Sequence, residues 1–176
     1  MVDCLRARDT LLFEEVGIRH GLVRVDFLVV NGFCHGYEIK SRPDAIRRLN
    51  QNAQIYCSAL DRLTLVITDE QLTQSIVGVP TWWGIELVIQ RKSGFTFSSI
   101  RDSDANPKVD KGALVKFLWR SEALEALNEL SAATGLRSKP RRAVYNKLAE
   151  CAGLPFIRKQ IHFHLQQRKV AQAATQ

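Results

Sequence analysis

Residues 22–40 alternate between apolar and polar side chains and predict two strands joined by a tight turn at Asn31-Gly32. A two-residue turn would place Asp26 and Glu38 on opposite faces of the hairpin. A three-residue loop at 30–32, with Gly32 in the left-handed conformation, separates an apolar face from a face that carries the charged residues Arg24, Asp26, Glu38 and Lys40. Because a one-residue slip would mix the two sets, we predict this loop or an equivalent bulge.

The periodicity of the flanking segments predicts an α/β fold. Residues 1–16 are ambiguous and fit a frayed helix that runs into a strand. After the hairpin, the pattern changes between helical and strand spacing and predicts a helix at 44–60, a buried strand at 63–68, a short helix at 69–77, and strands at 82–89 and 95–97. A hairpin followed by strand, helix and strand implies a mixed β-sheet flanked by helices.

A polar stretch at 101–112 predicts a boundary between this core and a helical segment. We therefore expect a core at 1–100, a linker at 101–112 and a helical segment at 113–176. In the helical segment, leucines at helical spacing predict a first helix that ends at Gly135. Pro140 and Pro155 indicate the starts of two more.

Composition limits the class of protein. The chain has 176 residues, of which 45% are hydrophobic and 24% charged, as in ordinary folded proteins. It shows no charged-then-apolar leader and no apolar run near 18 residues, so we expect a cytoplasmic protein without a membrane partner. Its four cysteines lack a C-x-x-C pair and are expected to be free, mostly buried thiols.

The formal net charge of +7 is concentrated near the C-terminus. Residues 137–169 hold nine Lys/Arg and one acidic residue, whereas the rest of the chain holds 16 Lys/Arg and 17 Asp/Glu. A localised basic region is typical of proteins that bind polyanions, although it can also be a solvated helical face. We predict that it contacts nucleic-acid phosphates through Arg141, Arg142, Arg158 and Lys159.

The spacing from Asp26 to Glu38-x-Lys40 is that of a metal-dependent phosphodiesterase site. Two carboxylates on adjacent strands suit Mg²⁺, which keeps several waters and needs few protein ligands, and the Ile39 carbonyl is a natural third ligand. Lys40 would orient the attacking water and stabilise charge on the phosphate. Such a short pattern also arises by chance on surface strands, so the motif alone does not decide the function.

The helix at 44–60 follows directly and carries further candidates. Arg48 suits a phosphate contact or a salt bridge with Asp44. Tyr56 suits either the site or the core. His162 and His164 are two residues apart on a helix and point to different faces, which makes them a poor metal pair.

Several segments together resemble the PD-(D/E)XK nuclease superfamily, namely RVD (24–26), GYEIKS (36–41), D-x-x-x-R-L (44–49), Tyr56 and LDRLTLV (60–66). VPTWWG (79–84), NP (106–107) and LWRSEAL (118–124) further resemble a small uncharacterised family of bacterial and phage proteins within it. The resemblance covers nearly the whole chain.

The resemblance implies a restriction-endonuclease-like fold and cleavage of nucleic acid with Mg²⁺ or Mn²⁺, with DNA favoured over RNA. By that pattern Asp26 and Glu38 are the metal ligands, Lys40 is the catalytic lysine and Glu15 is a further acidic residue. Relatives often carry a glutamine where this chain has Asn52, which has a shorter amide side chain. Repair, defence and phage biology are the expected settings. The rival interpretations are a nucleic-acid-binding protein without catalysis and a protein-interaction module.

Overall fold

The structure, a computed structural model, describes residues 10–40 and 44–174. The side chains of 44–48, 50, 51 and 74 are outside this description. The chain divides into two compact units, Met1–Val109 and Asp110–Gln176, and the division falls inside the predicted linker.

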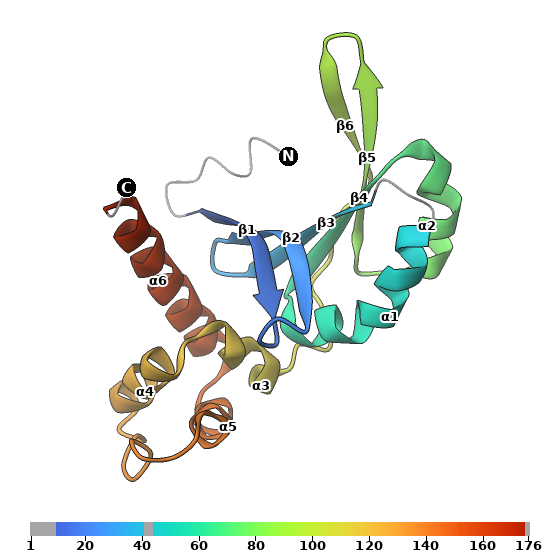
Figure 1. Ribbon diagram of the computed structural model, residues 1–176. Helices are drawn as coiled ribbons and strands as arrows, with labels where there is room; N and C mark the ends of the chain where they lie inside the picture. Colours follow the sequence, from blue (N-terminus) through green and yellow to red (C-terminus); the bar gives the residue numbers. More distant parts are fainter. Residues whose placement is uncertain (1–9, 41–43, 175–176) are drawn as a thin grey trace. The chain divides into compact units, whose positions relative to one another are not determined.

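The first unit is built on one six-stranded mixed sheet with the strand order β1-β2-β3-β4-β5-β6 (Figure 1). Pairs β3–β4 and β4–β5 are parallel, and the other neighbours are antiparallel. The predicted mixed α/β fold is thus confirmed. The elements of this unit are β1 (Leu11–Ile18), β2 (Val23–Val30), β3 (Cys34–Lys40), α1 (Asp44–Ala59), β4 (Arg62–Ile67), the 3₁₀ helix η2 (Asp69–Gln71), α2 (Leu72–Gly78), β5 (Gly84–Arg91) and β6 (Gly94–Arg101).

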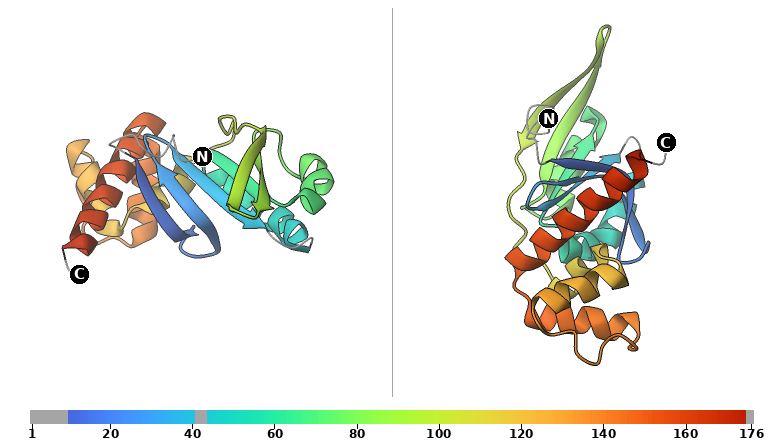
Figure 2. Two further views of the ribbon diagram at one scale, coloured as in Figure 1. Left: turned by 90° about the horizontal axis from the view of Figure 1, so that it is seen from above. Right: turned by 90° about the vertical axis from the view of Figure 1, so that its left-hand side faces the viewer.

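Strand β4 lies inside the sheet, and its side chains are mostly apolar. Leu63, Leu65 and Ile67 are completely buried, as expected for a strand with parallel neighbours on both sides. Helix α1 packs on the sheet face that carries Glu38, and its buried residues Leu49 and Tyr56 point inward. Helices α1 and α2 are in contact with each other (Figure 2).

The buried residue Asn106, near the end of the first unit, forms hydrogen bonds to the segment that follows helix α1 and to its last turn. Its amide nitrogen donates to the carbonyl oxygens of Cys57 and Leu60 over 2.6 and 2.7 Å, and its backbone N–H donates to Asp61 O over 2.8 Å. These bonds satisfy backbone carbonyls at the end of α1, which would otherwise lack partners.

The second unit is helical, and its elements are α3 (Lys111–Leu114), the 3₁₀ helix η3 (Val115–Phe117), α4 (Arg120–Glu129), α5 (Arg141–Cys151) and α6 (Leu154–Ala173). The prediction of one leucine-striped helix ending at Gly135 is wrong. A new helix starts at Trp119, where the Glu122 carboxylate accepts a hydrogen bond from the backbone N–H. That helix ends at Glu129 and is followed by Ser131 with φ 54°, whereas Gly135 lies in a later turn.

The described cysteines agree in part with the expectation of free, mostly buried thiols. Cys34, Cys57 and Cys151, the described cysteines, are free thiols, but Cys151 is exposed rather than buried.

Among the described residues, no helix is long and apolar enough to cross a membrane.

Candidate functional site

The turn between β2 and β3 decides whether Asp26 and Glu38 share a face. The strands pair from Phe27 with Tyr37 to Val30 with Cys34, so the loop has three residues, 31–33. The predicted loop length is confirmed, but the loop lies one residue later than the predicted 30–32. Gly32 at its centre has φ +90°, which favours glycine. A shift of the loop by one position keeps the parity of the pairing, so Asp26 comes opposite Glu38.

The sheet is irregular at Asp26 itself. Cα pairing between β1 and β2 includes Glu14 with Phe27 and Val16 with Val25, but the intervening pair Glu15 and Asp26 is not formed. Glu15 has a φ of 53°, which is uncommon for a residue with a side chain. This break in the β1–β2 pairing coincides with the position of the candidate aspartate.

The Asp26 carboxylate is bonded to the neighbouring strand. Its Oδ2 accepts a hydrogen bond of 2.6 Å from the backbone N–H of Ile39. Because the N–H and C=O of one strand residue point to the same side, the Ile39 carbonyl also faces β2. The aspartate is therefore held next to the main chain of the Glu38-Ile39-Lys40 segment.

Glu38 is a buried carboxylate, 1% exposed, with a donor on each oxygen. Lys40 Nζ lies 2.6 Å from Oε2, and the Tyr56 hydroxyl donates to Oε1 over 2.6 Å. Burial raises the pKa of Glu38, the hydrogen bonds from Lys40 and Tyr56 lower it, and the Asp26 carboxylate raises it further. The net pKa lies above the ordinary value.

Tyr56 comes from α1 and is 3% exposed. Its hydroxyl also lies 3.3 Å from the carbonyl oxygen of Arg24, and its ring meets the Trp83 indole edge-on. Burial and the nearby Glu38 carboxylate raise its pKa, so the phenol stays protonated and is a hydrogen-bond donor. Its hydroxyl contacts Glu38, whereas the contact of Tyr56 with nucleic acid stays a prediction.

Three further candidates belong to the first unit, namely Asn52, Glu15 and Arg48. Asn52 is half-buried one helical turn before Tyr56 on α1, hence on the same side of the helix. The exposed carboxylate of Glu15 lies 3.5 Å from the Arg24 guanidinium. The predicted phosphate contact or salt bridge of Arg48 depends on a side chain outside the described residues.

The donor set around Asp26 fits a small hard cation. Two carboxylates and one carbonyl oxygen match the few protein ligands that Mg²⁺ uses when it keeps several waters. The part of the chain that the structure describes has no group of three or more His, Cys, Asp or Glu that could hold a metal ion, so the Mg²⁺ site stays a prediction.

All of the net charge belongs to the second unit. Residues 110–176 contain twelve Lys/Arg and five Asp/Glu, a balance of +7, and residues 1–109 contain thirteen of each. Of the predicted phosphate-binding residues, Arg141 and Arg142 are exposed in the first turn of α5, Lys159 is exposed on α6 and Arg158 is half-buried there. Arg168 of α6 pairs with the Glu122 carboxylate through two nitrogens.

The sequence interpretation missed a second polar cluster in the first unit. His35 Nε2 lies 2.9 Å from Thr64 Oγ1, and both residues line a cavity of about 480 Å³ together with Arg62, Glu86 and Ser103. Burial and the Arg62 charge lower the pKa of His35 to about 4. The available signal was that His35 is a polar residue among apolar ones on its strand face.

The chain is similar to proteins of known sequence and structure. It is 24% identical to Protein cII of Enterobacteria phage P4 over 121 residues, which are 69% of this chain and 46% of that protein. The chain thus matches about half the length of this curated relative. A solved structure, the SPO1766 protein of unknown function from Silicibacter pomeroyi, has a TM-score of 0.46 and 20% identity, covering 77% of this chain and 89% of that one.

A family match covers almost the whole sequence. The family described as Bacteriophage P4 protein cII matches residues 3–173, both compact units included. The expectation of a phage-related family is confirmed, while membership of the PD-(D/E)XK nuclease superfamily stays a prediction. The chain belongs to the bacteriophage P4 protein cII family.

Proposed function

We propose that this protein is a Mg²⁺-dependent nuclease that hydrolyses phosphodiester bonds of DNA at Asp26, Glu38 and Lys40. The carrying observation is the arrangement of these three residues around the Ile39 main chain, with Asp26 on its N–H and Lys40 on the Glu38 carboxylate. A carboxylate pair beside an ammonium group can supply metal ligands and a cation for phosphodiester hydrolysis.

Asp26, Glu38 and the Ile39 carbonyl would hold the cation, and Mn²⁺ could replace Mg²⁺ there. Such an ion supplies charge neutralisation on the phosphate and a water of lowered pKa. Glu15, which is engaged with Arg24 in the structure, could join through a bridging water.

The residues of the chain have separate tasks in this proposal. Tyr56 and Lys40 keep the buried Glu38 carboxylate ionised and fixed in orientation, which a hard cation needs. The Lys40 ammonium would orient the attacking water and stabilise negative charge on the phosphate.

The second unit would bind the DNA backbone. Its balance of +7 suits counterion release on contact with phosphates, and the exposed Arg141, Arg142 and Lys159 are the groups that can reach them. Membership of a phage protein family fits a role in phage or mobile-element biology, repair or defence, in the host cytoplasm.

A nucleic-acid-binding protein without catalysis is the second candidate. The observation that favours it is that both Glu38 oxygens are already bonded to Lys40 and Tyr56. In that case Asp26, Glu38 and Lys40 would be a structural cluster. A protein-interaction module is the third, with the basic unit contacting an acidic partner.

Cleavage assays separate these candidates. Single- and double-stranded DNA and RNA are incubated with the wild type, Asp26→Asn, Lys40→Met and the control Glu70→Gln, which changes an exposed carboxylate of the same unit. Cleavage by wild type and control only, and only with Mg²⁺ or Mn²⁺, supports the nuclease. Salt-sensitive binding by all four proteins without cleavage supports the binding protein and overturns the proposal.

A further inference from the structure

Trp119 is a tryptophan held in a fixed orientation on the surface of the second unit. It is 61% exposed, whereas Trp82 and Trp83 of the first unit are 8% and 0% exposed. The Arg168 guanidinium lies over one face of its ring, 4.2 Å from the ring centroid.

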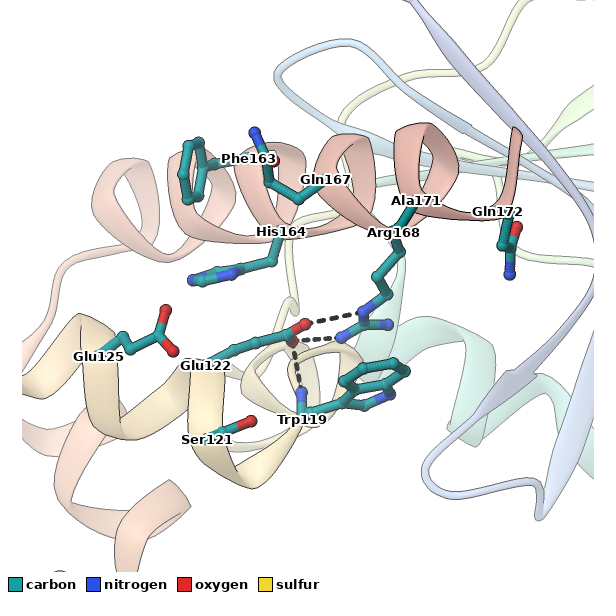
Figure 3. A pocket seen from close by; sticks show the side chains of 10 residues that line it. All are labelled: Trp119, Ser121, Glu122, Glu125, Phe163, His164, Gln167, Arg168, Ala171 and Gln172. Atoms are coloured by element: carbon teal, nitrogen blue, oxygen red, sulfur yellow. Dashed lines mark hydrogen bonds and ion pairs between the residues drawn. The ribbon is translucent and has the colours of Figure 1, made fainter. Parts of the chain in front are cut away.

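An ion pair keeps this arrangement in place. The Glu122 carboxylate accepts from Arg168 Nε over 2.8 Å and from the backbone N–H of Trp119 over 2.6 Å, so it joins α6 to the start of α4 (Figure 3). Arg168 and Glu122 are themselves largely buried, at 18% and 8% side-chain exposure. Because charge-assisted bidentate bonds are strong, the Arg168 guanidinium that lies against the indole has little freedom to move.

The Trp119 indole lines a groove of about 1010 Å³ between α4 and α6. Phe163, 48% exposed, lies along the same groove, and the neutral polar side chains of Ser121, Gln167 and Gln172 also line it. The groove therefore offers an aromatic ring together with hydrogen-bond donors and acceptors that carry no charge.

We propose that the Trp119 ring binds an unpaired base of single-stranded nucleic acid by stacking. Bases stack on exposed aromatic side chains regardless of sequence, and proteins that use this mode combine such a ring with a basic surface. Here the ring belongs to the unit whose balance is +7. The inference rests on the proposed function for the class of polymer and adds that its substrate has an unpaired segment.

An arginine under the indole suits this role. The guanidinium spreads positive charge next to the ring, which attracts phosphates near the stacked base, while Trp119 as a whole stays 61% exposed. Glu125 is the opposing feature, because it is an exposed carboxylate on the wall of the same groove. A basic peptide is the other occupant that this carboxylate would suit, and the experiment below distinguishes the two.

Tryptophan fluorescence provides the test. An oligothymidylate is titrated into the full-length protein in EDTA, with the emission of the exposed Trp119 as the readout. We expect saturable quenching by the wild type, loss of quenching but retention of affinity in Trp119→Phe, and affinity weaker by about 5- to 150-fold in Trp119→Ala. The control Val170→Ala, which truncates a 62% exposed side chain of α6, should bind like the wild type.

An abasic oligonucleotide of equal length isolates the base. It should bind wild type and Trp119→Ala equally and quench neither, because phosphate contacts remain and stacking is lost. Equal quenching by normal and abasic strands would overturn the proposal, as would quenching by an arginine-rich peptide but not by oligothymidylate. A cleavage assay of the wild type with Mg²⁺ separates the two hypotheses, since quenching without cleavage by the wild type would refute the nuclease and leave the stacking site supported.

Discussion

The hydroxyl of Tyr56 lies 2.6 Å from Glu38 Oε1 and joins helix α1 to strand β3 across eighteen positions of sequence. Both residues are almost fully buried, at 3% and 1% exposure. A buried carboxylate is costly unless hydrogen bonds satisfy it, and Tyr56 supplies one of the two side-chain donors. The contact makes the candidate site dependent on the packing of α1 against the sheet.

Replacement of Tyr56 by Phe should lower the free energy of unfolding by about 1.5–3 kcal/mol, because a charged acceptor loses its partner. The pKa of Glu38 should rise further, so the loss should shrink on acidification as that carboxylate takes up a proton. Urea unfolding at several pH values measures both effects. Tyr145→Phe is the matched control, since the Tyr145 hydroxyl donates to the neutral Leu118 carbonyl, and its loss should not shrink in acid through Glu38.

The ion pair between Lys40 and Glu38 should show strong coupling. Lys40→Met leaves the buried carboxylate without its cation and should destabilise the protein by about 3–5 kcal/mol, while Glu38→Gln combined with Lys40→Met should recover most of this loss. The measurement is a double-mutant cycle by urea denaturation. Additive effects would show that the pair contributes no coupling to the fold.

Divalent cations should stabilise the folded protein through the candidate site. Binding to the folded state raises the free energy of unfolding by about 1.4 kcal/mol when free Mg²⁺ is ten times its Kd. Thermal unfolding with Mg²⁺, Mn²⁺ or EDTA measures the shift, which Asp26→Asn should remove and the exposed control Glu70→Gln should keep. An equal shift in all three proteins would place the ion elsewhere.

The stability of the first unit should fall in mild acid because of His35. Its folded-state pKa of about 4 lies below the ordinary histidine value of 6.5, so the unfolded chain gains a proton that the folded chain excludes. Stability is therefore full above pH 6.5 and is lost as the pH falls toward 4, by on the order of 3 kcal/mol. Unfolding curves of wild type and His35→Gln across this range should differ in slope. Parallel curves would contradict a neutral, half-buried His35.

Within α4, two glutamates three residues apart should behave differently. Glu122→Ala removes the partner of Arg168 and the cap of Trp119, and should destabilise the helical unit by about 3 kcal/mol. The exposed control Glu125→Ala should change stability by less than about 0.5 kcal/mol. Hydrogen exchange of the α4 and α6 amides measures each effect, and similar protection in the two variants would show that the ion pair does not hold these helices.

The sequence alone determined most of the strands and helices of the first unit, because apolar periodicity reflects burial directly. It left the segment of β1 ambiguous and gave only the middle of β6, whose residues are nearly all exposed and therefore show no burial pattern. It also determined that Asp26 and Glu38 share a face, since an extra loop residue was needed to separate charged from apolar positions. The loop position was one residue off because a shift that keeps parity leaves the same pattern of faces. The ends of the helices in the second unit were harder to predict from the sequence, since a glutamate such as Glu122 is compatible both with the middle of a helix and with a cap.

Only the tertiary structure decided what the polar side chains contact. Hydrogen bonds such as Tyr56 to Glu38 and Ile39 N–H to Asp26 join residues far apart in sequence and depend on how elements pack, which periodicity does not encode. The same holds for Arg168, whose helical position fitted a solvent-facing cation and which instead pairs with Glu122 beneath Trp119. Local pattern fixes the face on which a residue lies, whereas its partner depends on the distance between elements that only the folded chain sets.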